Sequence, residues 1–581
     1  MNSKKEYIVS ALICFVVISL FRIPGIGMQY MYGLHALNIL DPDYLANTPE
    51  MIGINTSISP RLIFDYILLI PMKLGLSFEL VNYMYNIIAD FMFASAMVAL
   101  VSALKVKRLL LSSLCLVLCV YAMPIISIPF GFPYHYPNVL SITMAVSVEL
   151  IAVSFAIKER YGLAFLFACI GGLFHIHECM YGGAFVLILA AINCYKNRTI
   201  SVKYILYSLG WLFFVVALAI PTLLTDHAEI SNDVFCSYYM SEIGHFGFKK
   251  GLFSNVSYFL TIVALYYVTN KKLKGHVLVE NDVAIILFSV AVFAMLFIIL
   301  FVDIKPISFV YTLYVQKFFK YIALIFILQF VLYFDYLVDK NDYRPLLLAL
   351  CWIPSIVITP VLIVFSAFFI FIFRAKADKI YLPLAAINLA LYFGYSLAFG
   401  ADYMKILVTL ALLPLIFPYF NKKVILKYIS IVSLFVFLFV GFGRYYNKLF
   451  SKLDPATEQD EGFYAEMSKE IDKSEMYILS PMEKDIYTAV GISSKSQRSC
   501  YVWPMVPSTL LGTQINIDRM NYLKGWENWT LEEKCRVSKK LGVNYLVLTQ
   551  AEVGNERTNI VCDNRRYVLI KTELLDNRVR E

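Results

Sequence analysis

Charged residues are scarce in this sequence. Only 16% of its 581 residues are Asp, Glu, Lys or Arg, whereas 60% are hydrophobic. Soluble globular proteins carry roughly a quarter charged residues, so this composition predicts a chain that lies in lipid. The formal charge of +8 comes from short clusters of cations between apolar runs. It therefore does not indicate binding to nucleic acid.

Several sequence signatures are also missing. No small-residue cleavage site follows the apolar stretch 7–21, so this stretch resembles a signal anchor. The chain has no nucleotide-binding glycine loop and no strong zinc-ligand spacing. Most of the eleven cysteines lie within apolar runs, where they behave as small hydrophobic residues. Cys500, Cys535 and Cys562 lie in the polar tail, where two of them could form a disulfide.

Long apolar runs occupy most of the chain up to residue 443. They lie near 7–21, 80–104, 109–126, 139–157, 162–174, 180–195, 204–224, 255–269, 283–302, 318–334, 346–373, 380–398, 405–419 and 424–442. At about 20 residues per crossing, they predict an all-α polytopic membrane domain over 1–443 with roughly 14–15 helical spans.

Lysines and arginines gather in alternate turns between these runs, for example around 105–108, 158–160 and 196–203. The positive-inside rule therefore predicts a cytoplasmic N-terminus. Segment 346–373 crosses either once or, as a hairpin, twice. We predict the hairpin, because it keeps six further cations on the cytoplasmic side, although each limb has only about 14 residues. The tail is then extracytoplasmic.

The tail has a different composition. We interpret 444–475 as a helical linker and 476–581 as a small α/β extracytoplasmic domain, because short strand-like runs alternate there with helical stretches. The strand-like runs are Met476–Leu479, Tyr501–Val502, Tyr545–Thr549 and Tyr567–Lys571, and Thr530–Leu541 is a helical stretch.

A long outer loop, 22–79, follows the first apolar run, and loops of this length are usually functional. Residues 61–76 within it predict an amphipathic helix on the membrane interface. Asp41 and Asp43 flank Pro42, which favours an extended turn. Two acids in a first outer loop suggest a catalytic or metal site. The same Asp-Pro-Asp pattern is also typical of an ordinary turn, and taken alone the pattern favours the turn.

Histidines form the second group of candidate residues. On the predicted topology six face the outer side, namely His35, His135, His175, His177, His227 and His245. Histidine both carries protons near neutral pH and binds metals. His175 and Glu178, three residues apart at the end of an apolar run, share one face of a continuous helix. We interpret them as metal ligands or as contacts for a phosphate or sugar hydroxyl.

Other charged residues have two interpretations. Asp90 and Glu149 lie within predicted spans. They either form hydrogen bonds between helices or belong to a functional site. Lys250 and Arg444 could hold a phosphate, although lysines and arginines near span ends often reach toward the headgroups.

Two stretches resemble the GT-C-type glycosyltransferases, most closely their bacterial relatives of uncharacterised function. The first loop contributes Leu37–Asn47 and Ser59–Arg61 before a juxtamembrane helix. The tail contributes Arg498, Trp503, Trp526, Lys539–Leu548 and Asn564–Leu569. The resemblance implies transfer of a sugar from a polyprenyl-phosphate donor to a glycan or lipid acceptor, on the outer face of a bacterial plasma membrane, in surface polysaccharide or glycolipid assembly.

The resemblance also implies residue roles. Asp41 or Asp43 would be the general base, or the ligand of a divalent cation such as Mg²⁺ or Mn²⁺. The remaining candidates would bind substrate, namely His35, His135, His175, Glu178, His227, His245, Lys250 and Arg444. The chain departs from the family pattern in having Pro42 between the acids and no second acidic pair, so a non-catalytic relative is one alternative.

Two other function classes fit a chain with many spans. A transporter or flippase of lipid-linked sugars usually has internal repeats and gates on both faces, and this sequence has no clear repeat. An oligosaccharide polymerase is expected to use arginines in its outer loops, and this chain has few there. Both remain alternatives.

Overall fold

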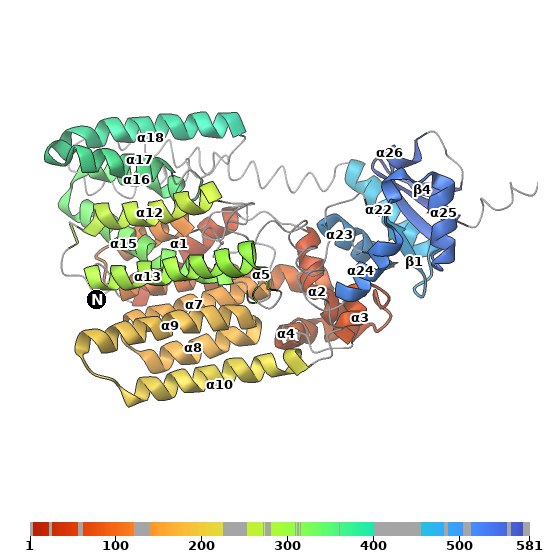
Figure 1. The fold of residues 1–581 in the computed structure, drawn as a ribbon, viewed down its shortest axis with the longest axis horizontal. Coiled ribbons are helices and arrows are strands. Elements are labelled where there is room, and N and C mark those ends of the chain that lie inside the picture. Colours follow the sequence, from red (N-terminus) through yellow and green to blue (C-terminus); the bar gives the residue numbers. More distant parts are fainter. Residues whose placement is uncertain are drawn as a thin grey trace, which may run out of the picture.

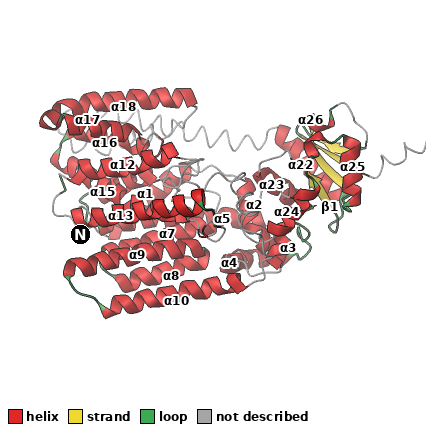
Figure 2. Cartoon of the chain, in the orientation of Figure 1, coloured by secondary structure: helices red, strands yellow, loops and turns green. Residues whose placement is uncertain are grey.

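A computed structural model describes most of the chain. The described residues are 4–21, 26–55, 62–120, 140–224, 252–270, 272–273, 280–307, 310, 313, 315–358, 361–399, 455–481, 486–502, 513–554 and 559–572. Helices make up the larger part, and the strands lie together in the tail (Figures 1 and 2).

The membrane part is a bundle of helices. These are α1 (Lys4–Phe21), α5 (Phe78–Ala103), α6 (Leu109–Val120), α7 (Leu140–Ile157), α8 (Tyr161–Phe174), α9 (Ile176–Asn197), α10 (Val202–Leu224), α12 (Leu252–Asn270), α13 (Asn281–Ile298), α15 (Phe319–Lys340), α16 (Tyr343–Ile358), α17 (Val361–Ile372) and α18 (Ala377–Phe399). They match the predicted apolar runs up to residue 398. The runs at 405–419 and 424–442 lie outside the described residues.

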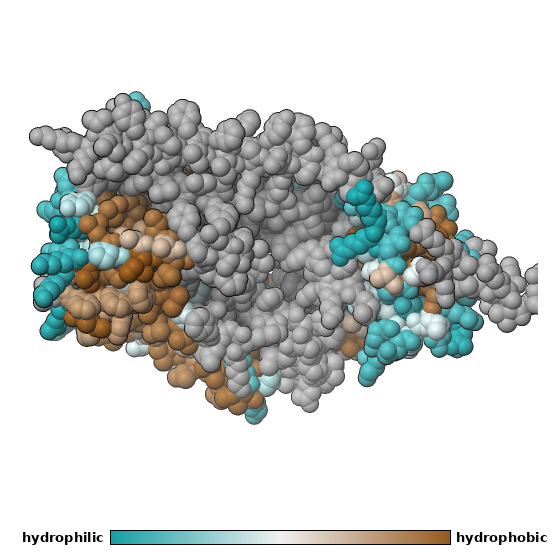
Figure 3. All heavy atoms as spheres, turned by 90° about the horizontal axis from the view of Figure 1, so that it is seen from above, coloured by the Kyte–Doolittle hydropathy of each residue, from teal (hydrophilic) through white to brown (hydrophobic). Residues whose placement is uncertain are grey.

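Five described helices are long and apolar enough to cross a membrane: Phe78–Ala103, Ile176–Asn197, Val202–Ile220, Asn281–Ile304 and Phe319–Lys340. Shorter apolar helices pack beside them. The chain is therefore a multi-pass membrane protein, as its composition predicts. Figure 3 agrees, since hydrophobic atoms gather on the described surface of the helical part and hydrophilic atoms cover most of the tail.

Two helices mark the centre and the edge of this bundle. Helix α15 lies at the centre of the bundle, because 94% of its most apolar stretch is buried inside the protein. Helix α10 is at the edge, with only 11% buried. Its outward face carries large apolar side chains, including Leu209 and Phe213, which in a membrane protein contact lipid.

Segment 346–373 forms the predicted hairpin. It divides into α16 and α17, and the chain then continues into α18. The Arg344 guanidinium donates to the Asp378 carbonyl at 3.3 Å, and the Cys351 thiol lies 3.6 Å from the Ala385 carbonyl. Helices α16 and α18 therefore run side by side in the same direction, and the segment returns to the end where it began.

The first loop contains three helices: α2 (Ile26–Leu40), α3 (Pro49–Asn55) and α4 (Leu62–Lys73). Helix α4 buries Phe64, Leu68 and Met72 against the bundle and exposes Tyr66 and Ile70. A helix lying on the bundle with a second apolar face outward suits the membrane interface predicted for it.

The tail folds around a small mixed sheet, and the predicted α/β domain is confirmed. Its elements are α22 (Pro455–Glu470), β1 (Met476–Leu479), α23 (Ile486–Ser496), β2 (Ser499–Cys500), α24 (Thr513–Tyr522), α25 (Leu531–Lys540), β3 (Tyr545–Thr549), α26 (Gln550–Val553), β4 (Ile560–Asp563) and β5 (Tyr567–Lys571). The strand order is β2-β1-β3-β5-β4, with β1 parallel to both neighbours and β5 antiparallel to both of its neighbours.

One prediction for the tail was wrong in detail. The strand expected at 501–502 is β2, two residues earlier, because Ser499 and Cys500 take the register beside β1. Cys500, Cys535 and Cys562 are all free thiols. Cys500 and Cys535 pack into two separate hydrophobic clusters of the tail, so they do not pair.

The first loop and the tail share one hydrophobic cluster, which holds them together. Leu34, Tyr44 and Leu45 of the loop pack in it with Phe463 and Met467 of α22. In Figure 1, the tail and α2–α4 accordingly lie at one end of the bundle, which we call the tail end, and the N-terminus lies at the opposite end.

Candidate functional site

Glu178 lies at the tail end of the bundle, in the first turn of α9. Helix α8 ends at Phe174, which packs against the cluster formed by α2 and α4. His175 then takes an extended conformation, with φ −161° and ψ 112°, and α9 begins at Ile176. The continuous helix expected across His175 is therefore broken. The break brings the rings of His175 and His177 to a centroid distance of 5.3 Å.

Three side chains from one short segment surround the Glu178 carboxylate. Lys320 Nζ lies 2.5 Å from Oε2, and the Tyr321 hydroxyl donates to the same oxygen at 3.1 Å. Lys317 Nζ lies 3.7 Å from Oε1. We call Glu178, Lys317, Lys320 and Tyr321 the buried charge cluster.

The central side chains of this cluster are fully buried. The side chains of Glu178 and Lys320 are 0% exposed, and that of Lys317 is 7% exposed. Removing each ion from water costs several kcal/mol, so such charges persist only where they are paired and hydrogen-bonded. The local sequence around the two lysines does not indicate this role, because a cation beside the start of an apolar helix usually reaches toward the headgroups.

Glu149 lies beside this cluster, on α7. Its side chain is fully buried, and its carboxylate fits between Gly171 of α8 and Gly182 of α9. A methyl group at either glycine would overlap the carboxylate oxygens. Within the described part of the chain, neither oxygen has a hydrogen-bond partner. The glycines around the His175–Glu178 stretch thus make room for a buried acid.

His35 and Asp65 form a second pair in the first loop. His35 Nδ1, on α2, lies 2.7 Å from Asp65 Oδ2 on α4, and Asp65 is almost fully buried. This contact joins the two loop helices at the tail end. Asp65 is a further acid of the first loop, and its local sequence indicates only an interruption of an apolar helix.

The predicted catalytic acids lie in a turn between α2 and α3. Asp41 Oδ1 accepts the Asp43 backbone N–H at 3.2 Å, and Asp41 Oδ2 lies 2.8 Å from Lys473 Nζ in the tail. The hydrogen bond from Lys473 lowers the pKa of the Asp41 carboxyl. The Asp43 side chain is exposed.

The structure does not join all the predicted residues. Among the described residues, neither Asp41 nor Asp43 forms a hydrogen bond or ion pair with His175 or Glu178. The other predicted substrate-binding residues lie outside the described residues: His135, His227, His245, Lys250 and Arg444.

The predicted divalent cation can be compared with the ligand-type side chains of the described residues. In the ranges given above, no group of three or more His, Cys, Asp or Glu side chains could hold one, and Glu178 is surrounded by ammonium groups instead. A divalent cation stays a prediction.

Comparisons with known proteins give one match. No protein-family model matches the chain, and no curated protein matches it. The chain is similar to a solved structure, the crystal structure of ArnT from Cupriavidus metallidurans bound to undecaprenyl phosphate, with 10% identity over 98% of this chain and 97% of that one. The TM-score is 0.39.

Proposed function

We propose that the chain is an integral membrane glycosyltransferase that moves a sugar from a polyprenyl-phosphate donor to a glycan or lipid acceptor. The buried charge cluster is the observation that carries this proposal. Ionisable side chains inside a membrane domain are costly and usually mark a pathway or a site for a substrate. An ammonium group is a common partner of a phosphate.

Lys317 is the proposed contact for the donor phosphate. Its ammonium lies 3.7 Å from Glu178, and its side chain is 7% exposed, whereas the side chains of Lys320 and Glu178 are 0% exposed. Lys317 is therefore the cation of the cluster that a phosphate oxygen would reach first, while Lys320 and Tyr321 keep the Glu178 carboxylate paired. A cation at that oxygen stabilises the negative charge that grows there as the sugar leaves.

Asp43 is the proposed general base. Asp41 is held by Lys473, and a carboxyl with a lowered pKa is a weaker base. The Asp43 carboxylate has no ion pair within the described residues and is exposed at the surface of the turn. It takes the proton from the acceptor hydroxyl, whose oxygen then forms a bond to the anomeric carbon. The bond from that carbon to the phosphate oxygen breaks, and polyprenyl phosphate leaves with the electron pair.

The first loop is built to bring an acceptor to this end of the bundle. The pair of His35 and Asp65 joins α2 to α4, and the shared hydrophobic cluster joins α2 to the tail. Phe174, next to His175, packs against the same loop helices. The loop, the tail and the start of α9 are thus one connected unit.

Reconstitution with a defined donor tests the proposal. Purified full-length protein in nanodiscs receives a polyprenyl-phosphate sugar and a lipid extract as acceptor, and both new glycan and released polyprenyl phosphate are measured. Lys317→Met is expected to lower kcat/KM about a hundredfold or more, as for loss of one group that stabilises transition-state charge. Asp43→Asn is expected to lower it by a similar factor, as for loss of a general base.

Lys340→Met is the matched control, because Lys340 is exposed at the other end of α15. It should transfer sugar at the wild-type rate. A protein that moves the intact lipid-linked sugar across a vesicle membrane, and yields no new glycan with any donor, would be a carrier. That result would overturn the proposal, as would full activity in the Lys317 and Asp43 variants.

A further inference from the structure

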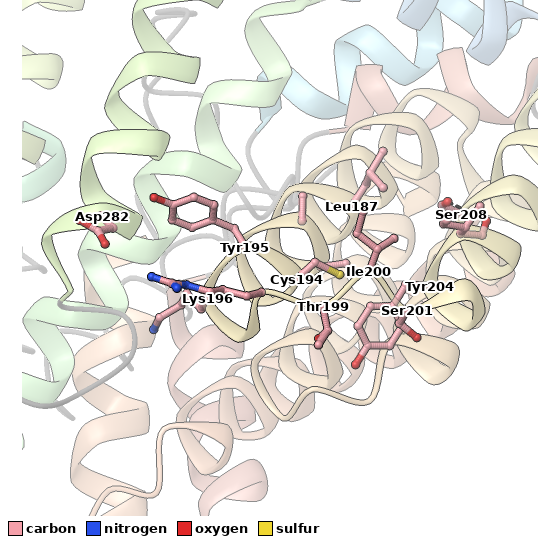
Figure 4. A pocket seen from close by; sticks show the side chains of 14 residues that line it. Leu187, Cys194, Tyr195, Lys196, Thr199, Ile200, Ser201, Tyr204, Ser208 and Asp282 are labelled. Atoms are coloured by element: carbon pink, nitrogen blue, oxygen red, sulfur yellow. Dashed lines mark hydrogen bonds between the residues drawn. The ribbon is translucent and has the colours of Figure 1, made fainter.

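A groove lies at the N-terminal end of the bundle, away from the buried charge cluster. It runs between the last turns of α9 and the first turns of α10, and Asp282 of α13 lies at one edge (Figure 4). Its volume is about 870 Å³. This volume is within the range of sites that bind small amphiphilic molecules.

The inner part of the groove is apolar. Leu187, Ala190 and Ala191 of α9 line it together with Ile205 of α10. The two alanines leave room between the helices, and Leu187 and Ile205 remain partly exposed. Because α10 lies at the edge of the bundle, this part of the groove opens toward lipid chains. It suits an acyl chain, whereas a free sugar or inorganic phosphate would gain nothing from it.

The rim of the groove is polar and carries cations. Arg198 ends α9 in the left-handed region, with φ 50°, and Thr199, Ser201 and Tyr204 follow it along the lining. Lys196 also lines the groove and forms an ion pair with Glu280. The Arg198 guanidinium has no ion pair within the described residues, so Arg198 supplies the available positive charge.

We infer that this groove binds one anionic phospholipid, with its phosphate at Arg198 and the adjoining hydroxyls and one acyl chain between α9 and α10. A guanidinium binds a phosphate through two parallel hydrogen bonds. Basic pockets between membrane helices are a recurring way to hold an anionic headgroup. Asp282 lies at one edge of the groove, beyond Tyr195 and Lys196 (Figure 4). The inference is independent of the proposed function, because it uses other residues at the other end of the bundle.

Lipid retention by the full-length protein tests this inference. The protein is purified in mild detergent, mixed with phosphatidylglycerol or phosphatidylcholine, and examined by native mass spectrometry for bound lipid. We expect one tightly held phosphatidylglycerol and no comparable phosphatidylcholine. Arg198→Gln is expected to lower phosphatidylglycerol affinity about fivefold, the effect of one cation beside an anionic headgroup.

Two further variants separate the parts of the site. Lys203→Gln removes the same charge from the exposed face of α10, five residues away and outside the lining, and should leave retention unchanged. Ala191→Trp fills the apolar part from its exposed side and should lower retention as well. Equal losses in Arg198→Gln and Lys203→Gln would overturn the inference, since they would indicate general attraction to a basic surface. Equal retention of the two lipids, or full retention in Ala191→Trp, would overturn it too.

Discussion

The ammonium of Lys320 lies 2.5 Å from the carboxylate of Glu178, and neither side chain is exposed. The two residues come from α15 and α9 and are separated by 142 positions in the chain. The attraction between the two opposite charges offsets the free-energy cost of removing each one from water. Their pairing therefore links the central helix of the bundle to the first turn of α9.

Removing one member of this pair should destabilise the protein strongly. Lys320→Met leaves a buried carboxylate with less compensation, and Glu178→Gln leaves two buried ammonium groups. Each change is expected to cost about 3–5 kcal/mol. The measurement is the thermal unfolding midpoint of the purified protein in detergent, followed by size-exclusion chromatography after heating.

The double variant is the informative comparison. Lys320→Met with Glu178→Gln removes both charges of the closest pair but leaves the Lys317 ammonium, so it should regain part of the lost stability. Lys340→Met, on the exposed end of the same helix, should unfold at the wild-type temperature. If Lys320→Met alone unfolds like Lys340→Met, the pair does not hold these helices together.

The architecture was largely predictable because its signals are local. Apolar runs of suitable length gave the helices, and the alternation of short strands with helices gave the tail. The hairpin over 346–373 was predictable from charge, since bending back keeps further cations on one side. These features depend on residues close together in sequence.

The candidate site was less predictable because its contacts join distant segments. Glu178 was selected from its sequence, but its partners Lys317 and Lys320 were not. Asp41 and Lys473 are separated by 432 positions, and nothing in either local sequence indicates the pairing. Helix patterns also do not reveal a break such as the one at His175, which changes the neighbours of every side chain after it.

Gly182 should tolerate no side chain, because the Glu149 carboxylate fills the space beside it. Gly182→Ala is expected to destabilise the protein by about 1–3 kcal/mol through overpacking. Gly210→Ala is the control, since an added methyl group on α10 meets no atom within 4 Å. That control should be as stable as the wild type or slightly more stable. The measurement is again the unfolding midpoint in detergent.

Shortening Glu149 should relieve the clash. Glu149→Ala combined with Gly182→Ala is expected to be more stable than Gly182→Ala alone, because the methyl group then occupies vacated space. Equal unfolding midpoints for Gly182→Ala and Gly210→Ala would show that Glu149 is not confined there.

The ion pair of Asp41 and Lys473 is expected to fasten the first loop to the tail rather than to act in catalysis. Both side chains are partly exposed, 41% and 45%, so the pair is worth about 0.2–1 kcal/mol. Asp41→Asn, Lys473→Met and the double variant should therefore raise amide hydrogen exchange in the turn 41–47 by similar small amounts. Sugar transfer should fall equally in all three. Loss of transfer in Asp41→Asn alone, with full transfer in Lys473→Met, would instead make Asp41 the base.

Glu552 connects several elements of the tail. Its Oε1 accepts from the Ser480 hydroxyl at 2.8 Å, the Trp526 indole N–H at 3.1 Å and Lys534 Nζ at 3.2 Å. Its Oε2 accepts the Thr549 backbone N–H at 3.0 Å. Burial raises the pKa of Glu552, but these donors together outweigh it and hold the pKa below the ordinary value. The charged form is thus favoured by folding.

The sign of the pH effect follows from that direction. A carboxyl whose pKa is lower in the folded protein stabilises it fully above the unfolded-state pKa, and this stabilisation is lost as the pH falls through the folded-state pKa. The protection of strand β3 against hydrogen exchange, taken relative to the intrinsic amide exchange rate at each pH, should therefore fall below the ordinary glutamate pKa. Glu552→Gln should exchange faster at neutral pH and depend less on pH over that range, because it cannot titrate. Glu532→Gln, an exposed acid of α25, should follow the wild type, and an unchanged acid response in Glu552→Gln would assign the effect to another group.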